Sequence, residues 1–185
     1  YNQCDPLERK RGITIYSKLA QFTFEDTEFT MLDTPGHVDF SAETERTLQV
    51  LDYALLMISA ADGISGQSET LWNLLEKYKI PTFIFFNKMD QPGADRTRLL
   101  NQFRAELSDC AVDFSGYAHS SGGETLDAFY DQLAMCDEAA MEEYLESHSV
   151  CEETIQDMIA ERKIFPCFFG SALKIEGIGD LLSGL

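Results

Sequence analysis

Thr82-Phe83-Ile84-Phe85-Phe86-Asn87-Lys88-Met89-Asp90 is the most informative stretch of this 185-residue chain. A run of β-branched and aromatic residues passes directly into a polar tetrapeptide. Continuous apolar runs of this length are typical of strands that are covered on both faces, as in parallel sheets. The stretch therefore predicts a central strand over 82–86, with Asn87 to Asp90 at its carboxyl end.

Three other apolar runs end in the same way. They cover 29–32, 53–58 and 165–169, and they lead into Asp33-Thr34-Pro35-Gly36, Ser59-Ala60-Ala61-Asp62-Gly63 and Gly170-Ser171-Ala172. Helical patterns lie between the runs, over 42–51, 69–78, 97–107, 126–145 and 152–159. Residues 13–24 are expected to form a strand that pairs with 29–33 through a turn near 25–26.

This alternation of strands and helices predicts an α/β fold with a mainly parallel sheet. In such sheets ligands bind at the carboxyl ends of the strands. All four polar motifs are placed at predicted carboxyl ends. We therefore expect one site built from four loops.

Acidic residues dominate the second half of the chain. The sequence holds 32 Asp and Glu against 14 Lys and Arg, and no Lys or Arg occurs between Arg104 and Arg162. This pattern predicts a helical, acidic insert over 99–163 with solvated faces. An electrostatic guard that repels phosphate backbones is the alternative interpretation. The charge argues against broad nucleic-acid binding and leaves Arg9-Lys10-Arg11 as a local basic contact.

Composition and length exclude several classes of protein. No apolar run approaches the roughly 20 residues that span a bilayer, and the first residues do not resemble a signal peptide. The five cysteines include no C-x-x-C pair, which favours small buried thiols in a reducing cytoplasm. The chain lacks an initiator Met, so we expect it to begin inside a longer protein.

Asn87-Lys88-Met89-Asp90 has the chemistry of a guanine-binding loop. The Asp90 carboxylate can accept hydrogen bonds from guanine N1–H and N2–H, for which adenine has no equivalent donors. Asn87 can hold the loop and contact the base edge, while the Lys88 stem lies along the ring. A site built around such polar groups rejects a ligand that lacks them by roughly 10⁴–10⁵-fold.

The 170–174 segment is expected to close the same pocket. Its backbone N–H groups can point at guanine O6, and the residues concerned are Ser171, Ala172 and Leu173. A plainer interpretation exists for each motif, because Ser171 and Asp33 can be helix N-caps and 87–90 can be an ordinary turn. The joint order of the motifs favours the nucleotide interpretation.

The two N-terminal motifs fit a phosphate and a metal ion. Asp33 can hold a hydrated Mg²⁺, and Gly36 lets a backbone N–H approach a phosphate without a Cβ clash. Thr14 can ligate Mg²⁺ through its hydroxyl while its N–H binds a γ-phosphate. Such a loop is ordered by a triphosphate and released after hydrolysis.

R-G-I-T at 11–14, D-T-P-G-H at 33–37, N-K-M-D at 87–90 and G-S-A-L-K at 170–174 together resemble the G domain of translational GTPases, specifically the elongation factor G group. The resemblance covers nearly the whole chain. It implies a P-loop NTPase-type fold that binds GTP or GDP with Mg²⁺ and hydrolyses GTP. It also implies that Thr14 belongs to switch I and that Asp33 opens switch II. His37 is implied to orient the attacking water.

Within that group, the length of the insert resembles the ribosomal protection proteins that confer tetracycline resistance. The implied partner is the ribosome, whose RNA the switch regions would contact. A monomeric cytoplasmic protein with no membrane or DNA partner is expected. The alternatives are the G domain of an elongation factor G-type translocase and a non-hydrolysing interaction fragment.

One departure from the family supports the last alternative. The phosphate-binding loop G-x-x-x-x-G-K-[ST] occurs nowhere in residues 1–185. The first strand and first helix of the fold would be absent with it. Residues 1–185 are thus expected to be an incomplete G domain, with weak nucleotide binding and little hydrolysis. We also expect a gap in the sheet between the 29–33 and 53–58 strands.

Overall fold

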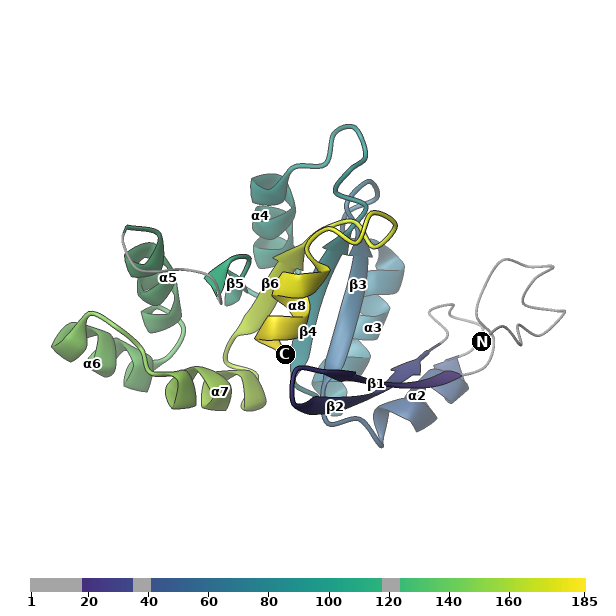
Figure 1. The fold of residues 1–185 in the computed structure, drawn as a ribbon, viewed down its shortest axis with the longest axis horizontal. Coiled ribbons are helices and arrows are strands. Elements are labelled where there is room, and N and C mark those ends of the chain that lie inside the picture. Colours follow the sequence, from purple (N-terminus) through teal and green to yellow (C-terminus); the bar gives the residue numbers. More distant parts are fainter. Residues whose placement is uncertain (1–17, 35–40, 118–123) are drawn as a thin grey trace, which may run out of the picture. The chain divides into compact units, whose positions relative to one another are not determined.

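A computed structural model describes residues 18–34, 41–117 and 124–185 of the chain. These residues belong to two compact units, Tyr1–Leu51 and Asp52–Leu185, each with its own sheet. Figure 1 colours the elements in chain order.

Among its described residues, the first unit contains an antiparallel hairpin and one helix. β1 (Lys18–Phe24) pairs with β2 (Thr27–Asp33), and Phe22 stacks on Phe29 with ring centroids 5.1 Å apart. Glu25 takes a positive φ of 50° in the two-residue turn, as tight hairpin turns require. The predicted turn near 25–26 is confirmed. α2 (Ser41–Leu48) follows, within the predicted helix over 42–51 apart from its first residue.

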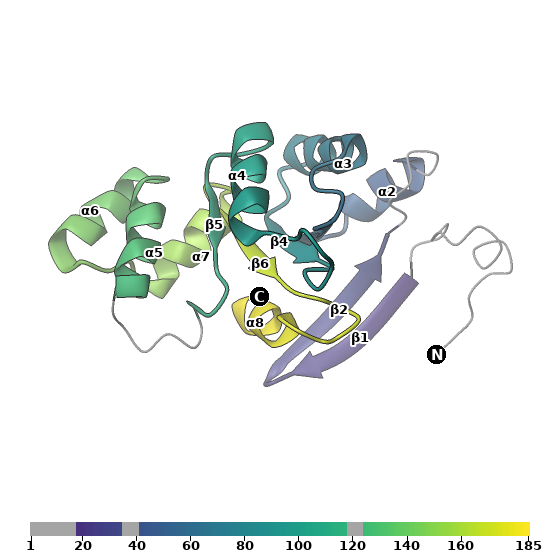
Figure 2. The ribbon, with the colours of Figure 1, turned by 90° about the horizontal axis from the view of Figure 1, so that it is seen from above.

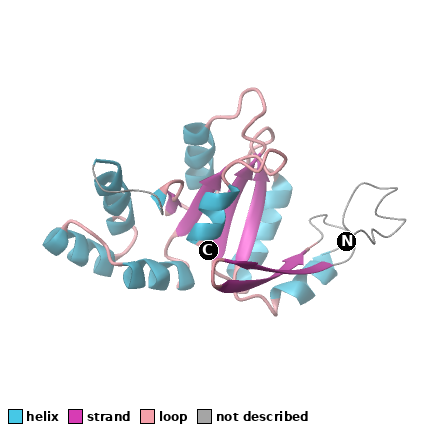
Figure 3. Ribbon diagram, viewed as in Figure 1, coloured by secondary structure: helices cyan, strands magenta, loops and turns pink. Residues whose placement is uncertain are grey.

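The second unit contains the predicted parallel sheet. Its strands are β3 (Ala54–Ser59), β4 (Thr82–Asn87), β5 (Ala111–Asp113) and β6 (Phe165–Phe169), in the spatial order β3-β4-β6-β5. All neighbouring pairs are parallel, and Figure 3 shows the strands side by side. The mainly parallel α/β fold is confirmed. Because β2 belongs to the other unit, the expected gap next to β3 stays a prediction.

Helices cover both faces of this sheet. Figure 2 shows α3 (Gly66–Lys77) and α4 (Arg96–Glu106) on one face and α8 (Ile178–Gly184) on the other. Phe86 on β4 meets Phe103 on α4 edge to face, at 6.2 Å between ring centroids. Its neighbour Phe85 joins the opposite apolar cluster, together with Phe168 and Leu181. Because both faces of β4 are covered by apolar side chains, the segment 82–86 is a continuous apolar run with no polar alternation.

The acidic region forms three helices: α5 (Glu124–Ala134), α6 (Glu138–Ser147) and α7 (Glu152–Ala160). Their apolar faces contribute Phe129, Leu133 and Met158 to the cluster that contains Phe85. The boundaries 99–163 of the insert stay a prediction. The expectation of one helical stretch over 126–145 is wrong, because two helices meet there at a turn over 135–137.

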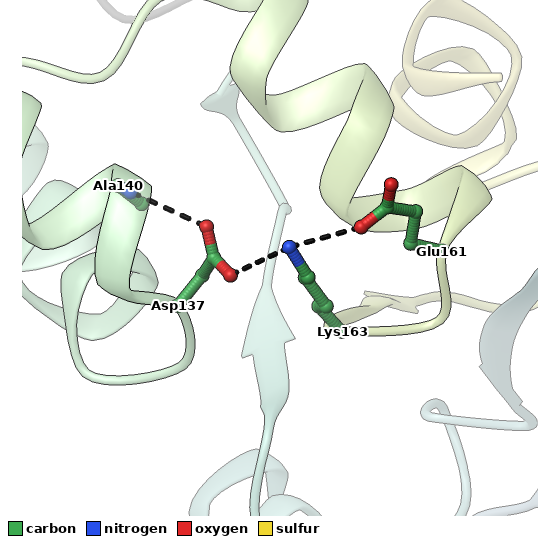
Figure 4. A network of polar contacts seen from close by, with 4 residues as sticks. All are labelled: Asp137, Ala140, Glu161 and Lys163. Atoms are coloured by element: carbon green, nitrogen blue, oxygen red, sulfur yellow. Dashed lines mark hydrogen bonds and ion pairs between the residues drawn. The ribbon is translucent and has the colours of Figure 1, made fainter.

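Asp137 explains that break. Its side chain caps α6 by accepting a hydrogen bond from the Ala140 N–H at 3.3 Å. Its other oxygen lies 2.7 Å from Lys163 Nζ, which is also 2.9 Å from Glu161 (Figure 4). The hydrogen bond from Lys163 lowers the pKa of Asp137, and the two carboxylates raise the pKa of Lys163. These paired charges tie the start of α6 to the end of α7.

Arg162 anchors the same segment to the sheet. Its Nη1 donates to the Ile80 carbonyl and, at 3.0 Å, to Thr82 Oγ1. The guanidinium carbon lies 5.3 Å from the ring centroid of Trp72 and 5.0 Å from that of Phe165. The guanidinium therefore connects the chain after α7 with α3, β4 and β6.

Arg162→Ala should lower the free energy of unfolding by about 2–4 kcal/mol, because it removes charged hydrogen bonds and two cation–π contacts. Urea unfolding of the variant and the parent chain measures the difference. Arg96→Ala is the matched control, since the exposed Arg96 guanidinium lies 4.9 Å over the Phe169 ring. That control should cost less than about 1 kcal/mol. Equal losses in both variants would contradict the anchoring role of Arg162.

Candidate nucleotide-binding site

Three of the predicted motifs meet at the carboxyl edge of the parallel sheet. Ser59 at the end of β3 is in register with Asn87 at the end of β4, and the Ala60 N–H donates to the Asn87 carbonyl at 2.8 Å. The Gly170 N–H, just after β6, donates to the Phe86 carbonyl at 3.0 Å. The parallel topology thus brings the loops after β3, β4 and β6 together.

The Asn87 side chain joins two of these loops. Its Oδ1 accepts hydrogen bonds from the Lys88 N–H at 2.8 Å and the Ala172 N–H at 2.9 Å. The Met89 N–H adds a bond to the Gly170 carbonyl at 3.0 Å. Lys88 takes a positive φ of 64°, which turns the chain back toward β6. The Asn87 side chain thus links the loops after β4 and β6, and its contact with a base edge stays a prediction.

Asp90 is an ionised carboxylate that lies against the loop after β6. A hydrogen bond from the Ser171 side chain is the main cause that holds the pKa of Asp90 below its ordinary value. The backbone N–H of Asp90 and the charge of Lys174 add to it. Lys174 Nζ lies 3.7 Å from Asp90 Oδ2. The side chain of Asp90 is 21% exposed, so a ligand can reach a carboxylate that is already charged and oriented.

The loop after β6 folds back on itself. The Ser171 N–H donates to the Glu176 carbonyl at 3.0 Å, and the Glu176 N–H donates to the Ser171 carbonyl at 3.1 Å. Ser171 is 1% exposed, whereas Leu173 is 91% exposed. The N–H groups of Ser171 and Ala172 are therefore engaged within the protein. The N–H of Leu173 can bind a ligand without losing a backbone hydrogen bond found in the described structure.

The remaining predicted residues lie elsewhere in the chain. Thr14, Gly36 and His37 are outside the described residues. Asp33 is the exposed last residue of β2, in the unit Tyr1–Leu51. Of the predicted nucleotide-binding residues, Asn87, Lys88, Asp90, Ser171, Ala172 and Leu173 lie together in Asp52–Leu185. The prediction of one four-loop site remains a prediction.

Magnesium requires few protein ligands. No group of three or more His, Cys, Asp or Glu side chains suited to a metal occurs among residues 18–34, 41–117 and 124–185. Mg²⁺ keeps several waters and binds through one or two side chains together with substrate phosphates. The pair Thr14 and Asp33 fits that requirement in number and in ligand type.

Two contacts of the site were not predicted. One is the bond between Asn87 and Ala172, which are 85 positions apart, and the other is the ion pair between Asp90 and Lys174. The G-S-A-L-K motif indicates that Lys174 belongs to the site. That Asp90 is its ion-pair partner follows only from the neighbouring positions of β4 and β6 in the sheet.

Known proteins of similar sequence identify the family of this chain. Residues 3–185 match the family described as "Elongation factor Tu GTP binding domain". The chain belongs to this family. Membership confirms the predicted relationship to translational GTPases, and the family implies guanine-nucleotide binding. In the part of the chain that the structure describes, no helix is long and apolar enough to span a membrane.

Two curated relatives illustrate the range of this family. The chain is 37% identical over 197 residues to the oxytetracycline resistance protein of Streptomyces rimosus, covering 97% of this chain and 30% of that protein. It is 34% identical over 220 residues to elongation factor G 1 of Syntrophus aciditrophicus (strain SB), covering 97% and 32%. The chain thus spans about three tenths of the length of these relatives.

A solved structure supports the fold. A crystal structure of a protein from Thermus thermophilus superposes with a TM-score of 0.80, at 20% sequence identity. The match covers 96% of this chain and 32% of that one. At this level of identity the likeness supports the G-domain fold alone.

Proposed function

We propose that this chain is the GTP-binding and GTP-hydrolysing module of a ribosome-associated factor that protects the ribosome against tetracycline. The observation that carries the GTP-binding part is the junction of two loops through Asn87 beside the ionised Asp90. The Asp90 carboxylate matches guanine, because it can accept hydrogen bonds from guanine N1–H and N2–H. Lys88 and Leu173 would flank the base, and the Leu173 N–H would bind O6.

The roles proposed for the phosphates and the reaction fall on residues of the unit Tyr1–Leu51. Thr14 and Asp33 would hold Mg²⁺, whose charge offsets that of the β- and γ-phosphates when it is bound. Gly36 would offer its N–H to the γ-phosphate, and His37 would orient the attacking water. These roles follow from the family motif, residue by residue.

The tetracycline part of the proposal rests on two features. Two resistance proteins, from Streptomyces rimosus and Clostridium perfringens, share 37% and 36% identity with the chain. In addition, the alignment with elongation factor G 1 is longer at equal coverage of this chain. The elongation factor therefore carries more residues that this chain lacks than the resistance protein does.

A translocase of the elongation factor G type is the second candidate, favoured by the 34% identity to elongation factor G 1. A non-hydrolysing interaction fragment is the third, and the phosphate loop G-x-x-x-x-G-K-[ST] distinguishes it from the other two. Because that loop supplies N–H groups and a Lys for the phosphates, affinity and hydrolysis should depend on it.

Calorimetry of GTP binding with Mg²⁺ tests the proposal, on residues 1–185 and on a version of the chain extended upstream through a phosphate loop. We expect the extended version to bind and hydrolyse GTP and residues 1–185 to bind more weakly. If neither binds, the guanine site is wrong and the interaction fragment is favoured. Release of ribosome-bound tetracycline by the full-length protein, measured beside translocation, separates the first two candidates.

A further inference from the structure

Two cysteines from different elements of the unit Asp52–Leu185 lie in contact. Cys110 directly precedes β5, and Cys136 lies in the turn between α5 and α6. The two thiol side chains lie close enough to influence each other's pKa. Nothing in their sequence spacing suggests a pair, and both are free thiols.

A second set of contacts holds the same two segments together without the sulfurs. Arg104 on α4 donates through Nε to the Ala111 carbonyl at 2.9 Å and through Nη2 to Gln132 Oε1 at 2.8 Å. Ala111 directly follows Cys110, and Gln132 lies one helical turn before Cys136. The Arg104 guanidinium therefore fixes the backbone positions from which both thiols project.

The surroundings keep both thiols mainly neutral, so the attacking thiolate is a minor form and the reaction with an oxidant is slow. Burial raises the pKa of Cys136 and of Cys110, and the carboxylate of Asp109 adds to this, whereas Arg104 opposes it. Both side chains are only partly buried, so small oxidants can reach them. A metal site is not indicated, since the described residues contain no group of three suitable ligands.

We propose that Cys110 and Cys136 form a reversible disulfide when the protein meets a peroxide. One thiol loses its proton, its sulfur attacks an oxygen of hydrogen peroxide, and the O–O bond breaks. The leaving hydroxide takes up that proton, so that a sulfenic acid and one water result. The second sulfur then attacks the first, the S–S bond forms, the S–O bond breaks, and a second water leaves. The sulfurs together lose two electrons to the peroxide, and a dithiol reductant reverses the reaction.

The disulfide would join the end of α5 to the start of β5, and it would close a loop that the unfolded chain otherwise leaves open. Cross-links of this kind stabilise mainly by restricting the unfolded chain. We expect oxidation to raise the Tm of the chain by about 5–10 °C. Addition of dithiothreitol should reverse the shift.

Peptide mapping after peroxide treatment identifies the bond. Trypsin is unsuitable, because the chain has no Lys or Arg between Arg104 and Arg162 and all its thiols in that region stay on one peptide. A Glu-specific protease cuts after Glu106, Glu124 and Glu138, which separates the two cysteines. We expect the peptides 107–124 and 125–138 to appear as one species, lighter by two hydrogens than their sum, until dithiothreitol separates them.

Serine variants supply the controls. Cys136→Ser and Cys110→Ser should each abolish both the joined species and the rise in Tm. Both variants are made so that the test still stands if one of them does not fold. Cys151→Ser, at the exposed N-cap of α7, should keep both effects. Unchanged thiols, separate sulfinic or sulfonic acids, or a link from Cys110 to Cys151 in the treated parent chain would each overturn the proposal.

Discussion

Asp90→Asn should reverse the base preference of this G domain, weakening GTP binding by roughly 10²–10⁴-fold. The carboxylate is the proposed acceptor for guanine N1–H and N2–H, and two charge-assisted hydrogen bonds are lost with it. Xanthine carries a carbonyl at C2, to which the asparagine Nδ2 can donate. Binding of XTP should therefore strengthen. The ratio of the two dissociation constants, measured by calorimetry on the chain extended upstream, reports the change.

Asp95→Asn is the matched control for this substitution. Asp95 caps α4 by accepting from the Arg98 N–H at 2.6 Å, and asparagine caps a helix about equally well. The control makes the same exchange of carboxylate for amide a few residues further along the chain, so base preference should not change. An unchanged GTP-to-XTP ratio in Asp90→Asn would refute the role of 87–90 in base recognition. The fold would not be in question.

Gly170→Ala should lower the free energy of unfolding by about 3 kcal/mol. A Cβ at this position would clash with the Glu176 carbonyl oxygen and would lie 2.9 Å from Cζ of Phe85. The first of these atoms is backbone and cannot rotate away. The paired hydrogen bonds between Ser171 and Glu176 must stretch or break to relieve the clash. Urea unfolding monitored by circular dichroism measures the loss.

Gly179→Ala provides the comparison, since a Cβ there meets no atom within 4 Å and the residue lies inside α8. Alanine favours helices, so this variant should gain about 0.5–1 kcal/mol. Gly170→Ala should also weaken GTP binding, because Gly170 connects β6 to the loop that contacts Asn87 and Asp90. Equal stability of the two variants would show that the loops do not pack as closely as described.

The strands and most helices could be predicted because their patterns are local. Buried runs such as 82–86 and 165–169 are continuous, and turn or cap residues bound the helices α3, α4 and α7. Two elements were missed for physical reasons. β5 has only three residues and exists because it pairs with β6, and α8 carries two glycines and depends on the burial of Leu181. The break at 135–137 coincides with the Asp137 cap, whose ion-pair partner Lys163 lies far along the chain.

The candidate site divides in the same way. The residue types at Asn87, Asp90 and Ser171 indicated guanine chemistry from the sequence, and the order of the motifs indicated the family. The partners of these residues did not follow from the sequence. Lys174 binds Asp90 and the Ala172 N–H binds Asn87 because β4 and β6 are neighbours, although β5 and several helices separate them along the chain.

Local patterns in the sequence were therefore sufficient to predict the α/β class, the G-domain motifs and the acidic character of 105–161. Each is a property of residues beside one another, where side-chain periodicity and spacing carry the information. The tertiary structure alone decided which distant groups meet: Arg162 with Trp72, Asp137 with Lys163, and Cys110 with Cys136. Such contacts depend on strand order and helix packing. No local pattern in the amino-acid sequence indicates them.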